Sequence, residues 1–256
     1  MPTYRLGTTS YILPNDILPN VRFLAEQVDD IELVLFEIGD GGLNLPPPAV
    51  IEQLALLGAK HGLSYTVHLP LDLRMVGKGN RLHHSLEKAR KVVERTAPLI
   101  PWAYVLHLDG KESYDCEAWV EQAVRSLELV GSWAGDPGLL AVENLENYPL
   151  DFIDPVLARV PVSRCVDVGH LWLEGHDPLA YLDKALPRTR VVHLHGIGTR
   201  DHQSLAHQPP EQVEAVLNWL RESSYAGVLT LEVFGQDDFE SSLAVVQRQE
   251  ARWVGG

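Results

Sequence analysis

The chain has 256 residues, and 45% of them are hydrophobic, which is enough for a large buried core. Its formal net charge is −14, from 35 acidic and 21 basic residues, whereas proteins that grip a nucleic-acid backbone usually present a basic face. The composition therefore weighs against a long nucleic acid as the partner.

The start of the chain, Met1 to Ser10, lacks the basic residues and apolar stretch of a secretory signal. Apolar runs also stay well short of the roughly 18 residues that a membrane span needs. We therefore expect a cytoplasmic protein with no membrane contact. Cys116 and Cys165 fall in different expected elements without a CxxC spacing, so we interpret both as packing residues rather than zinc ligands.

Short β-branched runs alternate with longer amphipathic segments along the whole chain, a pattern typical of βα units around a parallel sheet. The expected strands are Tyr4–Ser10, Ile31–Glu37, Leu63–His68, Ala103–Asp109, Leu139–Glu143, Arg164–Val168, Arg190–His195 and Val228–Phe234. The expected helices are Asp16–Val28, Pro48–His61, Arg81–Ala97, Cys116–Ala134, Asp151–Arg159, Pro178–Leu186, Glu211–Ser223 and Asp238–Arg252. Eight such units over residues 1–256 predict one α/β domain, a single (β/α)₈ TIM barrel.

Polar side chains stand at the carboxyl end of nearly every expected strand, and in a TIM barrel those ends meet on the face that carries the active site. These residues are Thr8, Thr9, Ser10, Glu37, His68, His107, Asp109, Glu143, Asn144, Asp167, His170, His193, His195 and Glu232. Burying such groups without partners would cost roughly 1–3 kcal/mol each. Bound metal ions would remove that cost.

Imidazoles and carboxylates without thiolates are the ligands expected for Zn²⁺, Mn²⁺ or Fe²⁺. Glu143, Asp167, Glu232 and one histidine of the seventh strand would suffice for a single ion. His68, His107, His170 and His202 exceed that need. We therefore expect two or three divalent ions per chain, zinc being favoured over manganese and iron. His193 and His195 are two residues apart and face the same way, which leaves open which of them is a ligand.

For the remaining polar residues, the sequence gives weaker evidence of a role in the site. Thr8, Thr9 and Ser10 could contact a substrate or simply end a strand. We expect Glu37 inside the ring at the end of the second strand. It could contact a substrate or support the ligands, and the same holds for Asn144 and Asn147. Five histidines are favoured as surface or packing residues: His61, His83, His84, His176 and His207.

Several motifs resemble those of the endonuclease IV and xylose isomerase-like superfamily, and the resemblance covers all eight units. They are VHLP (67–70), LHLDG (106–110), VENLEN (142–147), DVGH (167–170), HLHG (193–196), DHQSL (201–205) and LEV (231–233). In the endonuclease IV branch such motifs hold three zinc ions. The implied ligands here are His68, His107, Glu143, Asp167, His170, one of His193 and His195, His202 and Glu232.

One ligand of that branch has no match in register. The branch carries an aspartate two residues before the late histidine, but this chain has Arg200 there, and Asp201 is the possible substitute. The isomerase and epimerase branch keeps only two Glu, one Asp and one His around one metal. The presence of His68, His107 and His202 therefore favours hydrolysis of a phosphate ester.

A narrower resemblance lies outside the metal motifs, in LGTTSYILPNDILPNV (6–21), VDDIELVLFE (28–37) and YTVHLPLDLR (65–74). These segments are similar to the cobamide remodelling phosphodiesterases. The resemblance implies a hydrolase that opens the nucleotide loop of vitamin B12-type corrinoids and gives a cobinamide phosphate and an α-riboside. Such a small substrate also suits an acidic protein, since a corrinoid is not a polyanion.

In this hypothesis the carboxylates Glu143, Asp167 and Glu232 bind the ions and one of them orients the water. Three long loops, Gly39–Pro48, Leu71–Asn80 and Gly196–Pro209, are expected to form walls above the metals or merely to close the barrel top. The alternatives are a one-metal sugar isomerase or epimerase, an apurinic-site endonuclease, which the charge disfavours, and a non-catalytic binding barrel. The native metal, the preferred lower base and the oligomeric state stay open.

Overall fold

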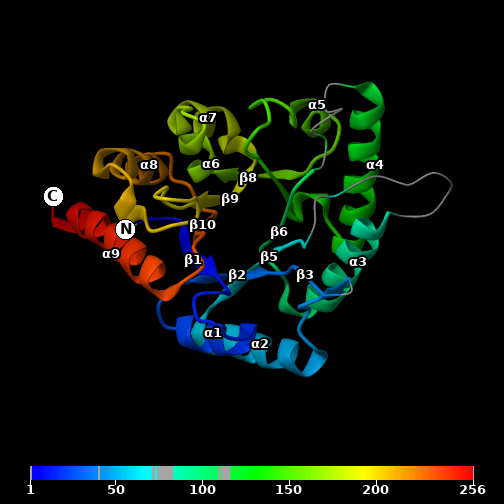
Figure 1. Ribbon diagram of the computed structural model, residues 1–256, viewed down its shortest axis with the longest axis horizontal. Coiled ribbons are helices and arrows are strands. Elements are labelled where there is room, and N and C mark those ends of the chain that lie inside the picture. Colours follow the sequence, from blue (N-terminus) through cyan, green and yellow to red (C-terminus); the bar gives the residue numbers. More distant parts are fainter. Residues whose placement is uncertain are drawn as a thin grey trace.

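The computed structural model describes residues 2–39, 41–70, 73, 83–108, 110 and 116–255. Eight parallel strands close into a barrel in the order β1-β10-β9-β8-β7-β6-β5-β2, and the helices lie around its outside (Figure 1). The predicted TIM barrel is thus confirmed. The loop Leu71–Asn80, apart from Leu73, and also Arg81 and Asp109 lie outside the described residues. Within the described ranges, no helix is long and apolar enough to span a bilayer.

The elements follow the expected alternation. The barrel strands are β1 (Arg5–Thr9), β2 (Asp30–Val34), β5 (Ser64–His68), β6 (Ala103–Leu106), β7 (Leu140–Glu143), β8 (Ser163–Asp167), β9 (Thr189–Leu194) and β10 (Val228–Leu231). The helices are α1 (Ile17–Leu24), α2 (Pro48–His61), α3 (His84–Thr96), α4 (Glu117–Ala134), α5 (Asp154–Leu157), α6 (Val168–Leu173), α7 (Pro178–Ala185), α8 (Pro210–Glu222) and α9 (Gln236–Gly255).

The second strand is shorter than expected, and this moves Glu37 out of the ring. β2 ends at Val34, and Glu37 instead belongs to a small antiparallel hairpin of β3 (Glu37–Ile38) and β4 (Gly42–Leu43). The turn of this hairpin contains Gly41 at φ 75°, a left-handed conformation that glycine adopts at little cost. The prediction that Glu37 ends a barrel strand was wrong.

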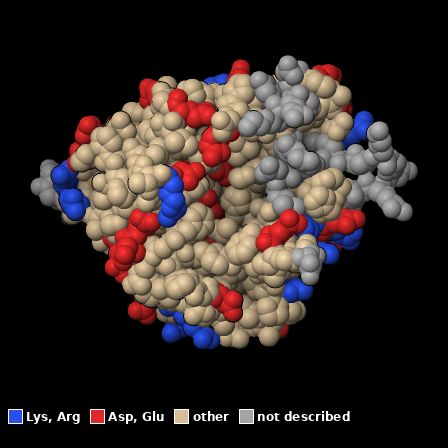
Figure 2. All heavy atoms as spheres, in the orientation of Figure 1, with Lys and Arg blue, Asp and Glu red and all other residues tan. Residues whose placement is uncertain are grey.

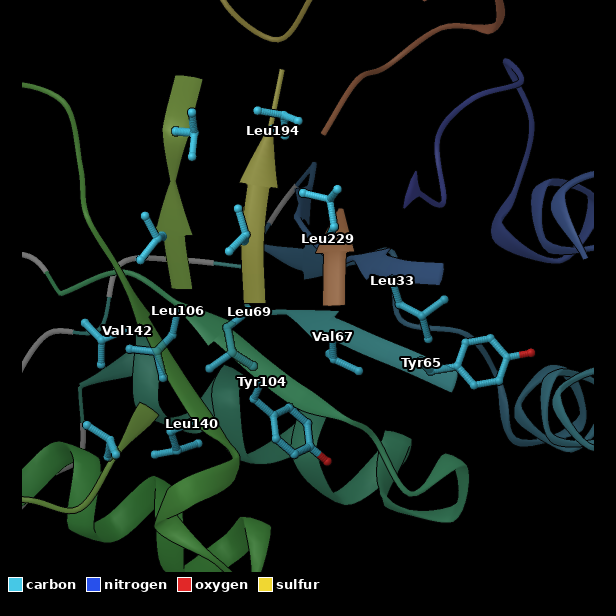
Figure 3. Close-up of a cluster of buried hydrophobic side chains, with 14 of the residues drawn as sticks. Leu33, Tyr65, Val67, Leu69, Tyr104, Leu106, Leu140, Val142, Leu194 and Leu229 are labelled. Carbon is cyan, nitrogen blue, oxygen red and sulfur yellow. The ribbon is translucent and has the colours of Figure 1, made fainter. Parts of the chain in front are cut away.

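Alternation along the strands separates an apolar outer face from a partly polar inner one. Large side chains such as Leu33, Tyr65 and Leu106 point out of the barrel, are almost fully buried, and form part of the core beneath the helices (Figure 3). The Tyr65 hydroxyl donates to the Leu54 carbonyl of α2 at 2.6 Å, which satisfies its one polar group. Because successive residues face opposite sides, the residues next to these in sequence point inward.

Candidate metal centre

The first cluster consists of His68, His107 and Glu143, from the ends of three neighbouring strands. Nε2 of His68 lies 3.5 Å and Nε2 of His107 lies 3.1 Å from Oε2 of Glu143. The other ring nitrogen of His68, Nδ1, lies 3.0 Å from the Leu69 carbonyl oxygen, which can only accept. His68 therefore carries its proton on Nδ1 and presents the lone pair of Nε2 to the cluster.

The second cluster consists of Glu143, Asp167, His193 and Glu232, whose ligand atoms lie within 4.8 Å of one another. Nδ1 of His193 is 3.1 Å from Oε2 of Glu232, 3.6 Å from Oε1 of Glu143 and 3.9 Å from Oδ2 of Asp167. All four residues are at least nine-tenths buried. Glu143 belongs to both clusters and turns one oxygen toward each.

Glu32 was missed by the sequence analysis. It points inward from the middle of β2, is fully buried, and its Oε2 lies 2.9 Å from Nε2 of His193. This contact fixes the ring orientation and leaves Nδ1 of His193 facing the second cluster. Carboxylates commonly hold metal-binding histidines in this way. The available signal was an acidic residue in the middle of a buried strand.

In these clusters, buried carboxylates face imidazoles, and the two kinds of group shift each other's pKa values. Burial alone would raise the pKa of Glu143, but the imidazoles of His193 and His107 hold it well below its usual range. Burial likewise acts to raise the pKa of Glu232, but His193 and His202 hold that pKa well below its usual range. Burial would lower the pKa of His202, but Glu232 raises it to about 9. The facing imidazoles thus favour the ionised form of these buried carboxylates, which is the form that binds a metal ion.

Several buried polar atoms in these clusters have no hydrogen-bond partner within the part of the chain that the structure describes. They are Oδ2 of Asp167, Nδ1 of His193, Nε2 of His195, Nδ1 of His202 and Oε2 of Glu232. Unpaired buried polar atoms are rare in folded proteins, and here they face one another across the barrel mouth. A nitrogen and oxygen set of this kind fits divalent ions such as Zn²⁺ or Mn²⁺.

Of the two histidines that the sequence left undecided, His193 presents a lone pair to the carboxylates and His195 does not. Nδ1 of His195 accepts from the backbone N–H of His202 at 3.0 Å, a shorter contact than the 3.3 Å to the carbonyl oxygen of Gly196. A neutral His195 ring therefore carries its proton on Nε2, which lies 3.3 Å from Oδ1 of Asp167. In this tautomer the Nε2 proton faces Asp167 without making a hydrogen bond to it.

The glycine of the DVGH motif makes room for this ring. A Cβ atom on Gly169 would lie 2.1 Å from Cε1 of His195, so any larger residue would displace the imidazole. Asp167 itself caps α6, since its Oδ1 accepts from the backbone N–H of His170 at 2.7 Å. The motif thus positions a carboxylate, a helix start and a histidine together.

The late loop brings further ligand atoms to the same mouth. His170, His195 and His202 form one group within 4.8 Å, and Glu146, His170 and Asp201 form another. His202 has φ 49°, a strained conformation for a residue with a side chain, and its Nδ1 lies 3.4 Å from Oε2 of Glu232. Asp201 thus lies in one of these groups, and its role as a substitute ligand stays a prediction; Glu146, in the same group, was not identified from the sequence.

Other residues expected at the site have structural contacts. The hydroxyls of Thr8 and Thr9 donate to the carbonyls of Leu231 and Val233, and Ser10 accepts from the backbone of Val34, so all three join the barrel wall. Asn144 is also turned inward: its amide makes two hydrogen bonds, of 3.0 and 2.9 Å, with the backbone of Asp167. These side chains therefore bind backbone atoms and hold the strands and Asp167 in place.

The remaining histidines lie elsewhere. His61, His83, His84, His176 and His207 join no group of potential metal ligands among the described residues. Nδ1 of His83 instead accepts from the backbone N–H of Ser85 and caps α3. Cys165 lies within reach of Glu143 and His193, but burial raises the pKa of its thiol well above the usual range. Without a bound ion, this burial favours the neutral thiol.

The mouth of the barrel combines acidic and aromatic surfaces. Asp and Glu side chains are visible inside a hollow near the middle of the face in Figure 2. A neighbouring groove of about 610 Å³ is lined by residues that include Tyr11, Phe36 and Phe234. The ring of Phe234 contacts that of His202, with ring centres 5.6 Å apart. One residue of the apolar groove, Phe234, therefore contacts a residue of the clusters.

Comparison with known proteins gives a family and several similar folds. The family profile described as Xylose isomerase-like TIM barrel matches residues 27–254. A D-tagatose 3-epimerase-like protein has a TM-score of 0.75 and 20% identity, covering 96% of this chain and 97% of its own. Endonuclease IV from Thermus thermophilus has a TM-score of 0.74 and 20% identity, covering 97% and 99%. None of the curated proteins matches the chain.

Proposed function

Because the chain belongs to the xylose isomerase-like TIM barrel family, we propose that it is a metal-dependent phosphodiesterase that opens the nucleotide loop of cobamides. The observation that carries this proposal is the Glu143 carboxylate. Its Oε2 lies toward His68 and His107, while its Oε1 lies toward His193. A carboxylate divided between two groups of ligands suits a site of two or more ions, which is common among enzymes that cleave phosphate esters.

Divalent ions in these clusters would polarise the phosphoryl oxygens and lower the pKa of the attacking water. Glu143 and Asp167 hold their positions through His107 and Asn144, and one buried oxygen of Glu232 receives no hydrogen bond from the described residues. We assign Glu232 to orient the water. The oxygen of this water bonds to phosphorus and gives up a proton, the bond from phosphorus to the ribose oxygen breaks, and the ribose oxygen takes up one proton in its place. The phosphate stays on the corrinoid, and an α-riboside leaves.

The aromatic groove supports a substrate with a flat apolar part, such as the lower base of a cobamide. Tyr11 and Phe36 contact each other with ring centres 5.2 Å apart, and Phe234 completes the wall beside His202. Aromatic walls favour stacking of planar groups. The net charge of −14 supports the same class, because it opposes a long polyanion more than a single diester on a bulky corrinoid.

A sugar isomerase or epimerase is the second candidate, and the second cluster alone favours it. Glu143, Asp167, His193 and Glu232 make a complete set for one ion, and Glu143 and Glu232 could exchange a proton with a carbon beside a carbonyl group. In such an enzyme the first cluster would be dispensable. His68→Ala therefore separates the two candidates: it removes a ligand of a phosphodiesterase but leaves the one-ion set intact.

The decisive experiment combines elemental analysis with a cleavage assay on purified protein. We expect two or three ions per chain, release of an α-riboside from a cobamide, and phosphate left on the corrinoid. A panel of ketoses and an abasic DNA duplex should remain unchanged, and His68→Ala should lose cobamide cleavage. If the cobamide is recovered intact while a ketose is interconverted by both proteins, the isomerase interpretation replaces this proposal. Nicking of the duplex would instead favour the endonuclease.

A further inference from the structure

A second groove, of about 330 Å³, lies at the amino ends of the barrel strands, at the end of the barrel opposite the metal clusters. Its walls are mostly apolar, come from the ends of α3 and α4 and from the segments before β6 and β7, and include Ile100, Trp102 and Trp133. Among the described residues that line it, Arg190 of β9 is the only charged one. We propose that this groove binds a small monocarboxylic acid with an apolar body, whose carboxylate pairs with Arg190.

Arg190 and Trp102 hold each other in place at this end of the barrel. The guanidinium lies over the indole ring, 4.4 Å from its centroid, and Nε donates to the Trp102 carbonyl at 2.5 Å. The indole Nε1 of Trp102 donates in return to the Arg190 carbonyl at 3.2 Å. No described residue accepts a hydrogen bond from Nη1 or Nη2 of Arg190. The guanidinium is therefore fixed in orientation, and it keeps the two nitrogens that can bind a carboxylate through parallel hydrogen bonds.

Comparison with other arginines that lie over aromatic rings shows what Arg190 lacks. In the described part of the chain, three more arginines are placed in this way, and each also forms an ion pair with a carboxylate. The ion pairs are Arg90 with Glu94, Arg164 with Asp154 and Arg221 with Glu222. Arg190 forms no ion pair with any described residue. The place that a carboxylate occupies beside the other three is therefore open to a ligand at Arg190.

The surroundings of Arg190 favour an anion with a single charge and an apolar body. Burial lowers the pKa of the half-buried guanidinium, because the charged form loses part of its hydration. The charge of Asp136 opposes this shift, but Asp136 forms no ion pair with Arg190, and its Oδ1 accepts from the backbone N–H of Gly138 at 2.8 Å. One carboxylate would balance one guanidinium, whereas a phosphate ester carries up to about two negative charges. Apolar walls with one fixed polar group are typical of sites for small organic ligands.

The test is a calorimetric titration of the full-length chain with four probes: octanoate, 3-phenylpropanoate, 3-phenylpropanamide and acetate. We expect each of the two larger acids to bind one site per chain, with a dissociation constant of about 1 mM or lower. The amide has the aromatic body without the charge, and acetate has the charge without the body. Both should therefore bind at least about tenfold more weakly. Tryptophan fluorescence should change with the two larger acids, because Trp102 and Trp133 line the groove.

Three variants locate the binding site. Arg190→Gln should weaken binding of both larger acids by about 10- to 100-fold, since it removes the charged partner of the carboxylate. Arg221→Gln is the matched control, because Arg221 also lies over a tryptophan ring but does not line the groove, and it should leave binding unchanged. Ile100→Glu changes a side chain of the groove that is 86% exposed, so the core should stay intact while the added negative charge weakens binding. Circular dichroism establishes that each variant is folded.

Several outcomes would overturn this inference. They are failure of both larger acids to bind, and equal binding of 3-phenylpropanoate and its amide. Undiminished binding in Arg190→Gln would place the acids elsewhere, for example at the metal clusters, and equal weakening in Arg221→Gln would indicate a general effect of surface charge. If Arg190→Gln does not fold, undiminished binding in Ile100→Glu overturns the site by itself. Cobamide cleavage is measured separately, so neither result decides the other.

Discussion

The two ends of the barrel interior hold buried carboxylates in opposite ways. At the amino end of β2, Asp30 is fully buried, accepts from the hydroxyl of Ser64, and has its pKa raised to about 6 by burial. At the carboxyl ends, Glu143 and Glu232 are equally buried, yet facing histidines hold their pKa values well below the usual range. A raised pKa marks a carboxyl group at which burial outweighs the nearby positive charge, whereas a lowered one marks a place where positive charge prevails.

The largest expected effect is on catalytic activity, from substitutions at the carboxyl ends of the strands. His107→Ala and Glu232→Ala each remove a ligand, and metal ions contribute several kcal/mol to such reactions, so cobamide cleavage should fall by about a thousandfold. The barrel should remain folded, because its apolar core lies between the strands and helices. Turnover, metal content and a thermal melt check this. Unchanged turnover with unchanged metal content in both variants would contradict the site.

At the amino end, Asp30→Asn should stabilise the protein. Since the folded pKa of about 6 exceeds the ordinary value of 3.8, ionised Asp30 costs stability above pH 6. A shift of this size corresponds to about 3 kcal/mol at pH 8. The gain from the variant should fade as the pH falls through 6 and vanish near pH 3.

Denaturant unfolding of both proteins from pH 4 to 8 measures this difference. Glu232→Gln in chelator-treated protein is the matched control at the other end of the barrel. Its carboxylate has a lowered pKa and stabilises the fold at neutral pH, so this variant should show no gain at pH 8. A gain in both variants would mean that the direction of the pKa shift does not distinguish the two ends.

A smaller effect is expected at Glu32, which lies between the two ends. Glu32→Gln keeps the side chain's shape but removes the charge that holds Nε2 of His193. Loss of such a supporting carboxylate typically weakens metal binding by about 10- to 100-fold. Zinc titration by calorimetry should show this change in one binding event, with the others unaffected. Equal weakening of every event would indicate a general distortion instead.

The sequence predicted the barrel well because strand periodicity and turn residues are local signals. β6 begins at the expected Ala103, and α2 has the expected bounds Pro48–His61. The end of β2 was missed because residues 37–38 pair with 42–43 in a hairpin, and hydrophobic periodicity does not predict which segments pair. α6 was missed because its six residues start inside the DVGH motif, where Asp167 serves as ligand candidate and helix cap at once.

The site residues show the same difference between what local sequence signals predict and what depends on contacts between distant segments. Strand-end residues such as His68, Glu143 and Glu232 were predicted and do converge, since topology alone brings strand ends together. Glu32 was not identified, because recognising it requires knowing which face of β2 points inward and that His193 lies across the barrel. The roles of Thr8 and Asn144 likewise depend on backbone atoms of other strands, which residue identity does not encode.

The smallest expected effect lies outside the barrel, at His83. Its ring caps α3 by accepting from the backbone N–H of Ser85 at 3.2 Å, and among the described residues it belongs to none of the potential metal-ligand groups. His83→Ala should therefore leave turnover and metal content unchanged while lowering stability by about 0.5–1 kcal/mol, the usual cost of a lost cap. His83→Asn, which can cap in the same way, should recover most of that loss. Denaturant unfolding of the three proteins beside the cleavage assay measures both quantities. A loss of turnover in His83→Ala that His83→Asn does not restore would connect α3 to the reaction and extend the functional region beyond the strand ends.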